Sequence, residues 1–115
     1  MSNFLNSIKS RRSIYAIGKN LTVDQATIEE TIREAVKQSP SSFNSQTSRV
    51  VTLYGESHHK FWEIVRETLR KMVPAEAFAN TSAKIDSFSA GFGTALFYED
   101  QDVVKGFQEQ FALYA

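Results

Sequence analysis

Two clusters of polar side chains in this sequence could bind a ligand that carries a phosphate at one end and a polar ring at the other. The first is the Arg-Arg-Ser stretch over residues 11–13, because a guanidinium fork beside a hydroxyl suits a phosphate group. The second lies within residues 39–49, where the amide side chains of Asn44 and Gln46 could hydrogen-bond the edge of a planar heteroaromatic ring. Together the clusters offer the hydrogen-bonding groups that a mononucleotide cofactor needs.

Both clusters also have ordinary structural interpretations. The basic residues suit the negative end of a short helix, which is expected over residues 3–10. Residues 39–49 could simply connect a helix to a strand. Pro40 disfavours helix at Ser39, so the preceding helix should end there, and an apolar run begins at Val50. Under either interpretation we expect a polar loop that is anchored at both ends.

The sequence gives little support for a catalytic cysteine, a metal site or a dinucleotide-binding motif. The sequence has no cysteine, and its two histidines, His58 and His59, are adjacent. Adjacent helical residues point in different directions, so we interpret this pair as the solvated start of a helix and not as metal ligands. Asp100 and Asp102, with Glu99, could hold a cation, but a capped helix N-terminus is the favoured interpretation. The glycines of residues 91–93 precede a strand, whereas those of a dinucleotide fingerprint follow one.

The composition restricts the class of protein. The chain has 115 residues, a length suited to one domain, which we expect to span residues 1–115. Thirteen basic side chains balance 13 acidic ones, so no net charge would attract nucleic acid or an anionic membrane. No apolar stretch approaches the ~20 residues of a membrane span, and the N-terminus lacks a signal peptide pattern. With no cysteine, the composition is typical of a cytoplasmic protein.

Hydrophobic periodicity predicts the elements that position the two clusters. Strands are expected where apolar and β-branched residues run together, over residues 50–54 and 94–98. Thr22, followed three residues later by Gln25, looks like a capping box. Trp62 lies off the apolar stripe of its helix, so it should contact another element or a partner. Helices are expected over residues 3–10, 24–38 and 57–71, from Pro74 onward, and around 104–111.

The end of the chain is unusual for a complete fold. Residues 111–115 are apolar and contain no Gly, Pro or basic residue that would end a helix. Two strands are also few for a stable sheet. These observations indicate a chain that is cut off in mid-fold.

The two polar clusters resemble the motifs of one family. Residues 11–13 are similar to the N-terminal Arg-x-Ser signature of the nitroreductase family of flavin enzymes, and residues 39–46 resemble its Pro-Ser-Ser-x-Asn-x-Gln loop. The similarity covers the whole chain in element order, and residues 94–100 look most like the subgroup named after the fatty acid repression mutant protein. The resemblance implies an α+β fold with a central, mostly antiparallel sheet surrounded by helices. It also implies that this chain is the N-terminal part of a longer domain and forms a homodimer.

The resemblance further implies the roles of particular residues. Arg11 and Ser13 would hold the phosphate of FMN, with Arg12 beside them. Tyr15 would also contact the cofactor, at a position where many relatives carry Lys or Arg. This difference predicts weaker stabilisation of the reduced, anionic flavin. Thr47 and Ser48 likewise stand where Pro-Trp is common. The residues that would contact the ring of a flavin bound mainly by the other subunit are Ser41, Ser42, Asn44 and Gln46.

The function implied by the resemblance is that of an FMN-dependent oxidoreductase. It would take a hydride from NADH or NADPH and pass electrons to nitroaromatic or quinone-like acceptors, with the flavin performing the chemistry. Two alternatives stay open: a flavin-binding or regulatory dimeric module without significant turnover, and a helical interaction fragment with exposed aromatic residues. Because part of each site would be missing, we expect this chain alone to bind FMN weakly or not at all.

Overall fold

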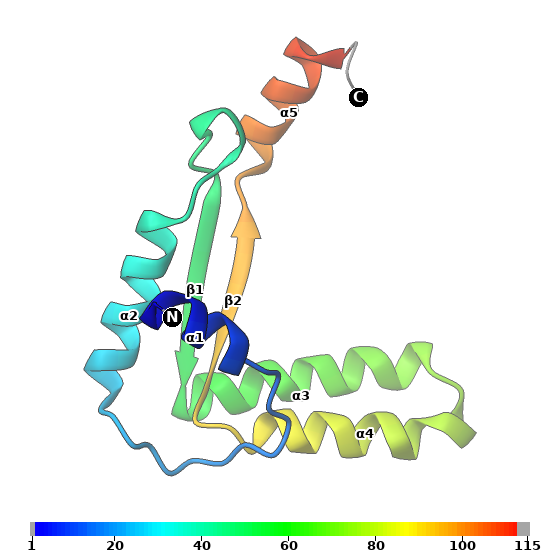
Figure 1. Ribbon diagram of the computed structural model, residues 1–115. Coiled ribbons are helices and arrows are strands. Elements are labelled where there is room, and N and C mark those ends of the chain that lie inside the picture. The colour runs from blue at the N-terminus through cyan, green and yellow to red at the C-terminus, as the bar shows by residue number, and fades with distance from the viewer. Residues whose placement is uncertain (1, 113–115) are drawn as a thin grey trace.

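A two-stranded antiparallel sheet organises the molecule, and helices lie at its sides and ends (Figure 1). The computed structural model describes residues 2–112, so the apolar residues Leu113 and Tyr114 at the end of the chain lie outside the described residues. The expected antiparallel strands with flanking helices are confirmed. In chain order the elements are α1 (Asn3–Ser10), α2 (Gln25–Gln38), a single 3-10 turn η1 (Ser42–Asn44), β1 (Ser48–Tyr54), α3 (Gly55–Met72), α4 (Ala75–Ser89), β2 (Gly93–Glu99) and α5 (Gln101–Gln110).

The strand register places the two ends of the sheet in different surroundings. Ser48 lies opposite Glu99 at the end where the η1 turn and α5 attach, and Tyr54 lies opposite Gly93 at the end where α3 begins. A β-carbon at Gly93 would come within 2.7 Å of the Leu53 carbonyl oxygen, so only glycine fits this close approach of the strands. The pairing therefore connects the polar loop before β1 directly to the end of β2.

Helices α3 and α4 form a hairpin that runs away from the sheet (Figure 1). The side chain of Arg66 on α3 is only 13% exposed because it reaches across to α4, where it pairs with Asp86 and hydrogen-bonds the Ser82 hydroxyl. The hydrogen bond with Asp86 raises the pKa of Arg66. One turn further on, the Arg70 guanidinium lies 4.7 Å from the ring centre of Phe78. The hairpin is thus held by charged residues as well as by its apolar stripe.

The described elements leave much apolar surface uncovered. Ile85 is the one apolar side chain with less than a tenth of its surface exposed among residues 2–112. The Cα radius of gyration is 18.2 Å, against about 13 Å for a compact chain of this length. The accessible surface is 9332 Å², against about 6,300 Å² for a compact monomer of the same mass. Within residues 2–112, no helix combines the length and apolar character that crossing a membrane requires.

The start of α2 differs from the capping box predicted at Thr22. The helix begins at Gln25, and its N-cap is Asp24, whose Oδ1 accepts a hydrogen bond from the Thr27 N–H at 2.9 Å. The capping-box prediction is wrong because a carboxylate directly before the first turn satisfies the free amide that Thr22 was expected to satisfy. A hydrogen bond from the Thr27 hydroxyl, together with the one from its N–H, lowers the pKa of Asp24.

Replacing Asp24 with alanine should destabilise the protein by about 1 kcal/mol, the usual cost of losing an N-cap. Thr22→Ala is the matched control, because Thr22 makes no hydrogen bond within the described residues, and it should change stability by less than about 0.5 kcal/mol. Denaturant unfolding of the two variants measures both values. An equal loss of unfolding free energy in the two variants would contradict the assignment of Asp24 as the N-cap.

An ionisable pair links α2 to the sheet and makes stability depend on pH. Hydrogen bonds from the hydroxyls of Thr52 and Tyr54 lower the pKa of Glu29 below its usual value of 4.5, and the Tyr54 bond is 2.5 Å long. Because the folded-state pKa lies below the unfolded one, the contribution of Glu29 is complete above pH 4.5 and is lost as the pH falls through the folded-state value. We therefore expect Tyr54→Phe to make stability fall less steeply on acidification, as measured by unfolding at several pH values. An unchanged slope would contradict the role of this pair.

Candidate functional site

The polar loop predicted to contact a ligand has an unusual backbone. Three non-glycine residues adopt positive φ: Phe43 at 54°, Asn44 at 52° and Gln46 at 53°. L-residues rarely enter this left-handed region, and such conformations persist only where the surrounding structure enforces them. Local strain of this kind is typical of segments that present groups to a ligand. Residues 41–46 are called the 41–46 loop below.

Hydrogen bonds within the 41–46 loop enforce part of this conformation. The N–H of Asn44 donates to the Ser41 carbonyl at 3.0 Å, and the N–H of Gln46 donates to the Ser41 hydroxyl at 3.0 Å. The N–H of Ser45 donates to the Ser42 carbonyl at the same distance. Serine and asparagine favour such turns because their side chains bond neighbouring backbone. Of the predicted site residues, Ser41 thus has a local structural role.

The side chains of Asn44 and Gln46 remain available to a ligand. Neither side-chain amide makes a hydrogen bond within residues 2–112, and both line a hollow of about 350 Å³. Ser41 and the exposed ring of Phe97 on β2 line the same hollow. The arrangement therefore brings three of the four predicted ring-contacting residues to one cavity, next to an apolar surface. Ser42, the fourth, lines a second hollow on the other side of the loop.

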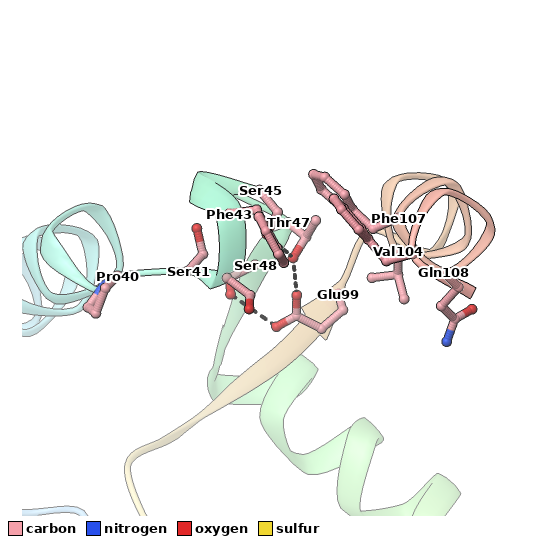
Figure 2. A pocket seen from close by; sticks show the side chains of 12 residues that line it. Pro40, Ser41, Phe43, Ser45, Thr47, Ser48, Glu99, Val104, Phe107 and Gln108 are labelled. Atoms are coloured by element: carbon pink, nitrogen blue, oxygen red, sulfur yellow. Dashed lines mark hydrogen bonds between the residues drawn. The ribbon is translucent and has the colours of Figure 1, made fainter. Parts of the chain in front are cut away.

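That second hollow is larger, about 520 Å³, and has an aromatic wall (Figure 2). The ring of Phe43, itself 71% exposed, stacks on Phe111 at 4.7 Å and on Phe107 at 5.9 Å between ring centres. Glu99 forms part of the opposite side. The sequence did not predict this hollow, because Phe107 and Phe111 indicated only the apolar face of a helix. The spacing of these residues alone could not show that Phe43 joins them.

The basic cluster lies elsewhere in the chain. The N–H of Arg11 caps α1 by donating to the Ser7 carbonyl at 3.0 Å, and Arg12, Ser13 and Tyr15 follow in an exposed, extended connector. No ion pair within residues 2–112 uses Arg11 or Arg12, so both guanidinium groups are free to bind an anion. Figure 1 shows this segment well apart from the η1 turn. A single chain therefore does not bring the two predicted clusters together.

His58 differs most from its expected role. The prediction of a solvated histidine pair is wrong for this residue, which is 1% exposed where α3 meets the start of β2. Its Nε2 lies 3.0 Å from the Ser89 carbonyl, which can only accept, so Nε2 carries the proton. Its Nδ1 then accepts from the Thr94 hydroxyl at 2.7 Å, and Thr94 in turn accepts from Trp62 Nε1–H at 2.9 Å. Trp62 thus contacts another element, as expected.

The acidic cluster after β2 caps a helix, as the sequence indicated. Asp100 Oδ1 accepts a hydrogen bond from the Asp102 N–H at 3.1 Å at the start of α5. The carboxylate also lies 3.4 Å from the guanidinium of Arg49. Both contacts are structural, so Asp100 belongs to the framework around the 41–46 loop.

The arrangement of strands and helices is that of the nitroreductase fold. The structure of the nitroreductase CinD from Lactococcus lactis in complex with chloramphenicol superposes with a TM-score of 0.79 and 48% sequence identity, over 98% of this chain and 56% of that one. The family model described as "Nitroreductase family" matches residues 8–112. The chain therefore belongs to the nitroreductase family, and the expected family membership is confirmed.

Two curated proteins of Saccharomyces cerevisiae are similar along nearly the whole chain. The putative nitroreductase HBN1 is 30% identical over 117 residues, and the nitroreductase FRM2 is 30% identical over 111 residues. The chain spans 58% and 54% of their respective lengths, or about half of each relative. Members of the family generally bind a flavin and are typically dimers.

Proposed function

We propose that this chain forms part of a homodimeric, cytoplasmic oxidoreductase that uses FMN, accepts electrons from NADH or NADPH and reduces nitroaromatic or quinone-like compounds. The observation that carries the proposal is the left-handed 41–46 loop, which leaves the amides of Asn44 and Gln46 free beside a hollow. Family membership supports it, because nitroreductases generally bind a flavin.

The residues present fit FMN at both of its ends. The free guanidinium groups of Arg11 and Arg12, with the Ser13 hydroxyl, match the charge and geometry of a phosphate. The amides of Asn44 and Gln46 can both donate to and accept from the edge of the isoalloxazine ring. When bound, FMN would supply the electron transfer between NAD(P)H and the acceptor. The protein's residues would bind and orient it, and Tyr15, a neutral group, would add no positive charge near it.

A second copy of the chain would bring the two clusters together. Within one chain they lie apart (Figure 1). Large apolar side chains on the sheet and on α1 are exposed, and a second copy could cover them. Obligate dimers commonly bury 2,000 Å² or more between subunits, roughly the scale of the surface excess of this chain over a compact monomer. In such a dimer Arg11 of one copy and Asn44 of the other would bind opposite ends of one cofactor.

The aromatic hollow is the proposed site for the electron acceptor. The rings of Phe43 and Phe107 offer flat apolar surface, on which a small aromatic compound can stack. Structures of CinD contain chloramphenicol, nicotinic acid or 4-nitrophenol, all of which carry such a ring. The 41–46 loop separates this hollow from the one that Asn44 and Gln46 line, so the acceptor and the flavin ring would meet at the loop.

Purification of the full-length protein with added FMN, followed by a turnover assay, tests this function. We expect a yellow protein that oxidises NADH or NADPH in the presence of 4-nitrophenol or a quinone. Tight flavin binding without turnover would instead favour the regulatory or flavin-binding module. A protein that stays colourless after reconstitution with FMN would contradict both.

A further inference from the structure

We propose that Glu99 is a positioning residue for the 41–46 loop. Its carboxylate holds the hydroxyls of Thr47 and Ser48 and thereby fixes the left-handed backbone that precedes them. Any effect of Glu99 on the cofactor rests on the proposed function. The hydrogen bonds from Thr47 and Ser48 to Glu99, called the clamp below, involve only described residues of this chain.

The geometry of Glu99 is that of a two-point clamp (Figure 2). As the last residue of β2 it lies opposite Ser48, whose hydroxyl donates to Oε1 at 3.0 Å. The hydroxyl of Thr47 donates to the other oxygen, Oε2, and Thr47 is only 5% exposed. The Asp100 N–H donates to the Thr47 carbonyl at 2.8 Å, so backbone and side chain of Thr47 are both fixed. Hydrogen bonds to a carboxylate are stronger than those between neutral groups, and here each oxygen has its own donor.

The 41–46 loop needs such external support. Phe43, Asn44 and Gln46 are all left-handed, which is unfavourable for residues with a side chain. The backbone hydrogen bonds inside the loop are all accepted by Ser41 and Ser42, at its beginning. At the far end, the single bond from the Gln46 N–H to the Ser41 hydroxyl is the one such bond that holds Gln46. The Thr47 hydroxyl, directly after Gln46, is where Glu99 acts.

Arg49 is the other candidate for this role, and it is the weaker one. Its Nη1 donates to the Gln46 carbonyl at 2.9 Å, and its Nη2 lies 3.4 Å from Asp100. The Arg49 side chain is 55% exposed, however, so solvent screens its ion pair. Glu99 is exposed as well, but one of its two bonds goes to the hydroxyl of Thr47, which is only 5% exposed, so water has less access to that bond. The clamp therefore depends mainly on Glu99.

A role for Glu99 in proton transfer or acceptor binding is less consistent with the geometry. Glu99 lines the aromatic hollow, but each of its oxygens already accepts a hydrogen bond from a hydroxyl. A group that acts through Thr47 and Ser48 on the backbone of a ligand-contacting loop is a positioning residue. Replacing Glu99 should therefore affect the backbone of the 41–46 loop more directly than any other part of the site.

Amide hydrogen exchange in the flavin-free, full-length protein tests the clamp. Glu99→Gln removes the charge and one acceptor, and Thr47→Val removes the buried donor at nearly constant shape. Both variants should speed up exchange at the Asn44, Ser45 and Gln46 amides by roughly ten- to a hundredfold, the effect expected for losing a hydrogen bond to a charged group. Glu109→Gln is the control, because the Glu109 side chain on α5 makes no hydrogen bond within the described residues, and it should leave these rates unchanged.

Unchanged exchange in both variants would overturn the clamp, and if Glu99→Gln does not fold, Thr47→Val decides the question alone. With FMN bound, the midpoint potential and the absorption maximum of the flavin should shift in Glu99→Gln and Thr47→Val but not in Glu109→Gln. Faster exchange without any flavin shift would contradict the positioning role. Failure of the wild-type protein to bind FMN would refute the proposed function, and the exchange rates would still decide the clamp.

Discussion

Replacing Arg11 with glutamine should weaken FMN binding by the full-length protein about a hundredfold. The guanidinium of Arg11 has no ion-pair partner within residues 2–112, so it is free to bind a phosphate at two points. Losing hydrogen bonds of this charged kind costs about 1.5–3 kcal/mol each, and about 2.8 kcal/mol corresponds to a hundredfold in affinity. Titration with FMN, followed by the quenching of flavin fluorescence, gives the dissociation constants of wild type and variant.

The control for Arg11→Gln is Lys84→Gln, which removes a cation from the exposed side of α4. It lowers the net charge equally, so it corrects for any general electrostatic attraction of FMN. We expect it to leave the affinity within about twofold of wild type. Equal weakening by both substitutions would mean that Arg11 contributes only general charge. If Arg11→Gln does not weaken FMN binding, the phosphate of FMN binds elsewhere in the protein.

The largest loss of stability is expected for His58→Leu, at about 2–4 kcal/mol. The substitution introduces an apolar side chain of similar size, which removes the donor to the Ser89 carbonyl and the acceptor of the Thr94 hydroxyl proton. Losing the partner of a buried polar group costs about 1–3 kcal/mol, and two such hydrogen bonds are lost here, while Thr94 keeps its bond from Trp62. The free energy of unfolding, measured at a fixed protein concentration because an oligomer's stability depends on concentration, gives the loss.

The adjacent histidine provides a matched control. His59 is exposed, and its ring nitrogens lie 3.2 Å from the Ser89 hydroxyl and 3.4 Å from Lys19 Nζ. Its ring also meets the ring of His58 edge-on, with 5.1 Å between the ring centres. His59→Leu should therefore cost less than about 1 kcal/mol. If the two substitutions cost the same, the buried network at His58 does not stabilise the junction of α3, α4 and β2.

The sequence predicted most of the elements because their signals are local. Apolar spacing located the helices, and the strands followed from their β-branched and apolar runs. The end of α2 at Gln38, just before Pro40, follows from backbone chemistry that any sequence with this proline would share. The cap of α2 was mistaken because Thr22 and Asp24 both carry oxygens that can cap a helix, and only the geometry selects between them.

The site was predictable only in its residue types. The motifs identified Arg11, Asn44 and Gln46 as ligand-binding candidates, yet they gave no sign of the left-handed backbone. One contact beside that backbone, from Thr47 to Glu99 on β2, joins residues far apart in the sequence, and local motifs do not report such contacts. The burial of His58 likewise depends on Thr94, which lies far along the chain and approaches only through the strand pairing. The aromatic hollow arises in the same way, from Phe43 in the loop and Phe107 on α5.

The central claim is that one flavin is bound by Arg11 of one copy and Asn44 of the other, and complementation between two defective variants tests it most directly. Arg11→Gln and Asn44→Ala homodimers should each bind FMN poorly. Co-expression of the two should form mixed dimers in which one site has both wild-type residues, so about a quarter of all sites should regain FMN binding. If both residues belonged to a site within one copy, every site would carry one defect. Co-expression would then restore no FMN binding, which would contradict the account.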